Sequence, residues 1–74
     1  MISNWREITV DVLAEKIGPV AIVIVNDVAK ELGITSSVID RETYSTFLMR
    51  LSRELPKGVN AVEVSKECRN RAAS

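Results

Sequence analysis

The stretch VAIVIV occupies residues 20–25 and directly follows Gly18 and Pro19. Taken alone it indicates a buried strand, because β-branched residues favour strands. A longer window favours a helix, since apolar residues recur every three or four positions and polar residues gather on the opposite side. The apolar positions are Ile17, Ala21, Ile24, Val25, Val28 and Leu32. We therefore predict that the stretch is the middle of a central helix that runs from Pro19 to Leu32.

Two residues of this stretch do not fit the apolar side of the predicted helix. Ile22 and Val23 point toward its polar side, where large apolar side chains do not contribute to the core of a single small domain. Surplus apolar surface is typical of a contact with another protein chain. We predict that Ile22 and Val23 form the centre of a partner-binding surface, to which Trp5 and Asn26 also contribute.

Helical spacing also predicts a first helix over residues 5–17. Its apolar positions are Trp5, Ile8, Val12, Leu13 and Ile17. The same region allows a second interpretation, because residues 8–12 alternate apolar and polar like a half-buried strand. In that alternative, residues 7–12 pair with residues 20–25 in an α/β fragment. Gly18 and Pro19 separate the two segments, since glycine often ends a helix and proline suits the first turn of the next.

The second half of the chain predicts two further helices. One covers residues 44–55, with Asp40 or Ser37 as its cap. Its apolar stripe is Tyr44, Phe47, Leu48, Leu51 and Leu55. The other runs from Ala61 to about Arg71, after a capping-box start at residues 60–63. Its apolar positions (Ala61, Val64 or Ser65, Cys68 and Ala72) are small, so we expect it to pack at the margin of the core.

These segments predict an all-α fold, a compact bundle of about four short helices. We expect one domain over residues 1–74, with its core within residues 5–56 and a weaker C-terminal helix at residues 60–72.

Residues 28–39 have the spacing of a helix-turn-helix motif, in which Ala29 permits close helix crossing and Gly33 makes the turn. The second helix of that motif would cover residues 36–42 and offers one cation beside two anions. Phosphate binding normally needs a cluster of Lys and Arg. A capped helix followed by a turn is the better interpretation, and a small DNA-binding transcriptional regulator is the alternative function.

The composition is that of a folded, electrically neutral domain. Of its 74 residues 46% are hydrophobic and 27% are charged, and ten Lys and Arg balance ten Asp and Glu. No net charge attracts the chain to nucleic acid or to an anionic membrane, so we expect neither as a partner. We see no signal peptide and no membrane span, and the single cysteine excludes an internal disulfide. A cytoplasmic location is therefore expected.

The chain contains no histidine, which removes the usual base for a serine or cysteine nucleophile and the commonest metal ligand. We therefore interpret Cys68 as a packing residue. The carboxylates of Asp11 and Glu15, and those of Glu63 and Glu67, lie one helical turn apart. Neighbouring lysines indicate solvated helix faces at both pairs rather than cation sites. We predict that the protein is not an enzyme and binds no metal and no cofactor.

Residues 13–21 read LAEKIGPVA. This pattern resembles a small helical accessory domain found near the C-termini of some bacterial serine/threonine kinases and signalling regulators, notably in cyanobacteria. A looser likeness continues through residues 44–51 and 54–56, whereas residues 26–27 are less basic than that pattern. The resemblance implies a non-catalytic module for self-association or partner binding.

The sequence therefore predicts a cytoplasmic adaptor or regulatory module. We expect it to form a homodimer through the apolar surface around Ile22 and Val23, and to dock onto a larger signalling protein.

Overall fold

The computed structural model describes residues 1–73, and these residues form four α-helices. Helix α1 spans Trp5–Ile17, α2 spans Val20–Glu31, α3 spans Arg41–Glu54 and α4 spans Ala61–Ala73. The described residues contain no strand, so the predicted all-α bundle of four short helices is confirmed. The strand alternative for residues 7–12 is wrong, because these residues lie inside α1.

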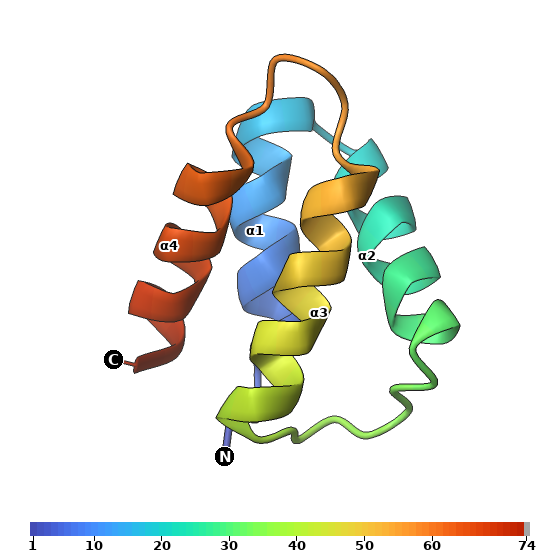
Figure 1. Cartoon of the computed structure of the whole chain (residues 1–74), viewed down its shortest axis with the longest axis vertical. Helices are drawn as coiled ribbons and strands as arrows, with labels where there is room; N and C mark the ends of the chain where they lie inside the picture. The colour runs from blue at the N-terminus through green and yellow to red at the C-terminus, as the bar shows by residue number, and fades with distance from the viewer. Residues whose placement is uncertain (74) are drawn as a thin grey trace.

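The helices run alternately up and down, so that each is antiparallel to the next (Figure 1). Helices α2 and α4 flank α1 on either side, and α3 lies between α2 and α4 in front of α1 (Figure 1). Each helix thus packs against two neighbours in a closed ring, which is the arrangement of a four-helix bundle.

The corner between α1 and α2 depends on a glycine. Gly18 adopts a φ of 73°, a conformation that costs little only for glycine, and its N–H donates to the carbonyl oxygen of Ala14 at 2.9 Å. Pro19 follows with a φ of −63° and precedes the first residue of α2. The predicted helix from Pro19 to Leu32 is confirmed to within one residue at each end.

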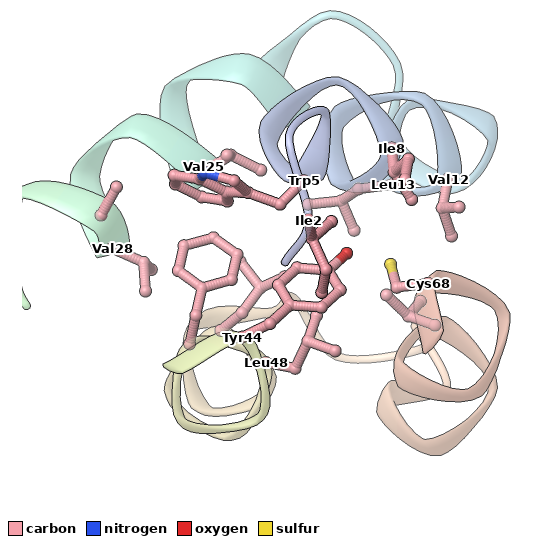
Figure 2. Packing of buried hydrophobic residues seen from close by; sticks show 14 of the residues in the cluster. Ile2, Trp5, Ile8, Val12, Leu13, Val25, Val28, Tyr44, Leu48 and Cys68 are labelled. Atoms are coloured by element: carbon pink, nitrogen blue, oxygen red, sulfur yellow. The ribbon is translucent and has the colours of Figure 1, made fainter. Parts of the chain in front are cut away.

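All four helices contribute side chains to one core, which fills the space between the α1–α2 pair and the α3–α4 pair (Figure 2). The central aromatic group is Trp5 with Phe47, whose rings meet edge to face at 5.1 Å between centroids. The buried apolar residues are Ile2, Trp5, Ile8, Val12, Leu13, Ala21, Val25, Val28, Ala29, Ile39, Tyr44, Phe47, Leu48, Leu51, Val64 and Cys68.

Two expectations about this core are wrong. Helix α4 does not pack at the margin, because Val64 is 1% exposed and Cys68 is 0% exposed. The apolar side of α4 is narrow, but its residues Val64 and Cys68 both join the common core. Leu32 does not belong to the buried stripe: α2 ends at Glu31, and Leu32 beyond it is 38% exposed.

The connection from α2 to α3 is held by the N-terminal residues of the chain. Ile2 and Ile39 exchange two backbone hydrogen bonds of 2.7 and 3.1 Å, and the indole N–H of Trp5 donates to the carbonyl oxygen of Ser36 at 3.3 Å. This pairing keeps residues 34–40 out of a helix. The second helix that a helix-turn-helix motif requires at residues 36–42 therefore does not form, and the next helix begins at Arg41.

Side-chain caps start α3 and α4. The Asp40 carboxylate accepts the N–H of Thr43 at 2.7 Å, so the Asp40 alternative for the cap is confirmed. The Asn60 side chain accepts the N–H of Glu63 at 3.1 Å in the same way. Hydrogen bonds from the side chain and the backbone N–H of Thr43 hold the pKa of the Asp40 carboxyl below its ordinary value of 3.8.

We expect the stability that Asp40 confers to depend on pH. A carboxyl whose pKa is lowered by folding stabilises the folded state above its unfolded pKa, near pH 4, and this contribution is lost as pH falls through the folded pKa. Asp40→Asn keeps a capping oxygen without the charge. Its thermal midpoint should therefore lie below that of the wild type at pH 7, and the gap should close in acid.

Thermal unfolding at pH 7 and in acid measures the difference in thermal midpoint between Asp40→Asn and the wild type. Asp27→Asn is the matched control, since Asp27 is exposed in the middle of α2 and accepts no hydrogen bond from any residue between 1 and 73. A gap for Asp40→Asn that does not change with pH would contradict the role of the charge.

Candidate interaction surfaces

The N-terminal half of α2 exposes three large apolar side chains. Ile22 and Val23 are each 52% exposed and Val20 is 47% exposed, although Ala21 and Val25 on the same turns are fully buried. The structure therefore places Ile22 and Val23 where the sequence predicts them, on the outer side of the helix. We refer to Val20, Ile22 and Val23 as the α2 patch.

Asn26 borders the α2 patch and is tied to the neighbouring helix. Its side-chain oxygen accepts a 2.6 Å hydrogen bond from the guanidinium of Arg6 on α1. This hydrogen bond fixes one edge of the α2 patch against α1.

Trp5 does not lie on this surface. Its ring is 1% exposed and packs edge to face against Phe47, while the guanidinium of Arg6 lies over it at 4.7 Å from the ring centroid. Trp5 is therefore a core residue in this structure, and the prediction that it contributes to partner binding is wrong. Its indole N–H is bonded to Ser36 in the α2–α3 connection, which helps to hold the ring inside the core.

A second apolar surface lies between α3 and α4. Met49 is 66% exposed and Val62 is 76% exposed, which makes them the most exposed large apolar residues of the four described helices. Both line a groove of about 550 Å³. This surface was not among those predicted from the sequence. The signal was present, because Met49 and Val62 fall off the apolar stripes of their helices just as Ile22 and Val23 do.

One carboxylate of each predicted pair, Glu15 on α1 and Glu67 on α4, lies near Arg71. The guanidinium of Arg71 lies 3.0 Å from Glu15 and 3.7 Å from Glu67. All three side chains are substantially exposed, so this contact stabilises the fold only slightly. Within residues 1–73 there is no cluster of three or more acidic, Cys or His side chains able to hold a metal ion.

Three buried side chains with polar groups, Thr9, Tyr44 and Cys68, form a small cluster within the core. The hydroxyl of Thr9 lies 2.7 Å from the carbonyl oxygen of Trp5 and 2.8 Å from the hydroxyl of Tyr44. The Cys68 sulfur lies on the side of the Tyr44 hydroxyl (Figure 2), and the thiol interacts with the hydroxyls of both Tyr44 and Thr9. Burial raises the pKa of the Cys68 thiol and that of the Tyr44 phenol, so both groups stay neutral and serve packing.

None of the described helices combines the length and the apolar character needed to cross a bilayer.

Comparison with known proteins identifies the family to which this four-helix domain belongs. A family model described as "Domain of unknown function (DUF8082)" matches residues 4–74, which is nearly the entire chain, so the protein belongs to this family. Searches of curated proteins and of solved structures gave no match.

Proposed function

We propose that the protein is a non-enzymatic interaction module that forms a homodimer through the α2 patch. The observation that carries this proposal is the pair Ile22 and Val23, each 52% exposed on a helix whose opposite side is fully buried. Removing apolar surface from water contributes roughly 25 cal/mol per Å². A domain of this length has a thin stability margin, so a second copy that covers the patch also stabilises the fold.

The α2 patch suits a two-fold interface, in which the same surface of both copies meets itself. Its apolar residues occupy the N-terminal half of the exposed side of α2, and the exposed residues Asn26, Asp27 and Lys30 follow them. Packing two copies at Ile22 and Val23 gives an apolar centre with a polar rim, as in known interfaces.

The size of the domain limits this dimer. A standard interface covers about 800 Å² of each partner. That area is about one sixth of the 4703 Å² exposed by this chain. Because the α2 patch has only three large apolar residues, we expect a dissociation constant in the micromolar range or weaker.

The proposal includes a larger signalling or regulatory protein as a second partner, in the bacterial cytoplasm. Its support is the likeness of residues 13–21 to accessory domains of bacterial kinases and regulators. Those residues form the end of α1, the corner and the start of α2, and the α2 patch begins there.

Analytical ultracentrifugation over a wide concentration range tests the dimer. Ile22→Glu is expected to weaken self-association at least tenfold, because it places two like charges in the apolar centre. Val38→Glu is the matched control, since Val38 is 40% exposed but lies in the α2–α3 connection. The control should associate as the wild type does.

Circular dichroism should show unchanged helix content in both variants, because both side chains are exposed. A wild-type protein that stays monomeric at millimolar concentration would overturn the proposal. An equal loss of association in Ile22→Glu and Val38→Glu would place the dimer contact elsewhere.

A further inference from the structure

The groove between α3 and α4 has the shape of a helix-binding site. Its floor contains small side chains, because Ser52 on α3 and Ser65 on α4 meet there with their hydroxyl oxygens 3.4 Å apart. Met49 and Val62 stand at its edges, 66% and 76% exposed. A shallow floor between two apolar edges accepts the apolar side of an amphipathic helix, and methionine adapts its shape to different ligands.

The groove is positively charged within a neutral protein. Lys66 and Arg69 line it, and Arg69 also lines the adjoining smaller cavity of about 120 Å³, together with Arg41. Neither cavity has an Asp or Glu among its lining residues. Lys66 also borders the neighbouring surface that carries Glu63 and Glu67.

Among the described residues, Arg41, Lys66 and Arg69 have no carboxylate partner, whereas two other arginines are paired with carboxylates. Arg50 is paired with Glu31 at 2.6 Å, and Arg71 is paired with Glu15. Across residues 1–73, no carboxylate lies within ion-pair distance of Arg41, Lys66 or Arg69. An occupant that brings carboxylates along the edge of the groove therefore supplies partners that this chain does not.

We propose that the α3–α4 groove binds an acidic amphipathic helix of a partner protein. The apolar side of that helix packs between Met49 and Val62, and its carboxylates pair with Lys66, Arg69 and Arg41. The lining residues on α4 run from Ala61 to Asn70, which is about 15 Å of helix, so the groove accommodates about three turns of the partner helix.

A second copy of this chain does not fit the groove as well. Its most acidic exposed surface is on α1, where Glu7, Asp11 and Glu15 follow one another at four-residue steps. The exposed residues of α1 are all charged, so α1 offers carboxylates without the apolar side that Met49 and Val62 need. The exposed apolar residues of α2 are covered in the proposed dimer, and Glu31 at the end of α2 is paired with Arg50. The occupant is therefore a helix from a different protein.

Titration with designed peptides tests this proposal on the full-length chain. The probe is a helical peptide of about four turns with leucine at every third or fourth position and glutamate on both flanks. One control peptide replaces each glutamate with lysine, and another has the acidic composition in a scrambled order. Two-dimensional NMR reports both the affinity and the residues affected.

We expect the acidic amphipathic peptide to shift the resonances of α3 and α4 around Met49 and Val62, with a lower affinity at high salt. The basic and scrambled peptides should bind at least tenfold more weakly. Arg69→Glu and Val62→Ser should each reduce the affinity at least tenfold. Ile22→Glu on the opposite helix should leave it unchanged, which separates this groove from the proposed dimer surface.

Three results would overturn the proposal. One is no binding of the acidic amphipathic peptide at millimolar concentration. Another is equal binding of the acidic and basic peptides. The third is a shift of the groove resonances with protein concentration alone, which would make the groove a contact between copies of this chain.

Discussion

Phe47→Ala is expected to destabilise the protein by about 3–5 kcal/mol, the largest effect of any single substitution considered for this chain. The Phe47 side chain is completely buried, and its ring contacts both Trp5 and Tyr44, with centroids 5.1 and 6.2 Å away. Its removal leaves a cavity between α1 and α3 at the centre of the core. A domain of this length has a total stability of about 4–11 kcal/mol, so much of the folded population is lost.

Urea unfolding followed by circular dichroism measures this cost, and Trp5 fluorescence gives a second probe beside the cavity. Phe47→Leu is expected to lose less stability than Phe47→Ala. Its unfolding free energy can therefore be measured even if the alanine variant is already unfolded without urea. Met49→Ala on the same helix is the control. Met49 is 66% exposed, so a change within about 0.5 kcal/mol is expected. A cost below about 1.5 kcal/mol for Phe47→Ala would show that Phe47 does not anchor the core.

The helices of this fold could be predicted where local patterns decide the structure. Helix α3 has a wide apolar stripe and an acidic cap at Asp40, and both features act within a few residues. The corner at Gly18 and Pro19 is equally local, because one residue needs a positive φ and the next has a fixed one. In these segments the sequence pattern and the tertiary structure agree.

Features that depend on contacts between distant residues could not be predicted. Ile2 lies in a segment without a periodic pattern, and its role appears only when it pairs with Ile39. The ion pair of Arg71 with Glu15 joins helices at opposite ends of the chain. The depth at which Cys68 is buried depends on how closely α4 approaches its neighbours, which its own small side chains do not reveal.

For the candidate surfaces, too, the exposed residues were predictable and the tertiary groove was not. Ile22, Val23, Met49 and Val62 all lie off the apolar stripes of their helices, so their exposure follows from helical periodicity alone. The groove itself is a tertiary feature, because its floor and its edges come from two helices. The burial of Trp5 also depends on a distant segment, because its indole N–H bonds to Ser36 in the α2–α3 connection.

Thr9→Val is expected to destabilise the protein by about 1–3 kcal/mol, although it exchanges one buried side chain for another of the same shape. The Thr9 hydroxyl has one hydrogen, and the carbonyl oxygen of Trp5 at 2.7 Å can only accept it. The 2.8 Å contact with Tyr44 is therefore made by the tyrosine O–H, which donates to Thr9. Valine removes this acceptor and leaves the buried Tyr44 hydroxyl with only the Cys68 sulfur, a weak acceptor.

Tyr44→Phe should cost less, about 0.5–1.5 kcal/mol, because Thr9 keeps its own bond to Trp5. In the double variant Thr9→Val/Tyr44→Phe both polar groups are absent, and apolar groups of the same shape replace them. The double variant is therefore expected to be more stable than Thr9→Val alone. A double-mutant cycle by urea unfolding measures this coupling, and strictly additive costs would refute the donor assignment. If Thr9→Val acts by leaving a cavity, the cost stays the same whether or not Tyr44 keeps its oxygen. If it acts by leaving the Tyr44 hydroxyl without its Thr9 acceptor, removing that hydroxyl lowers the cost.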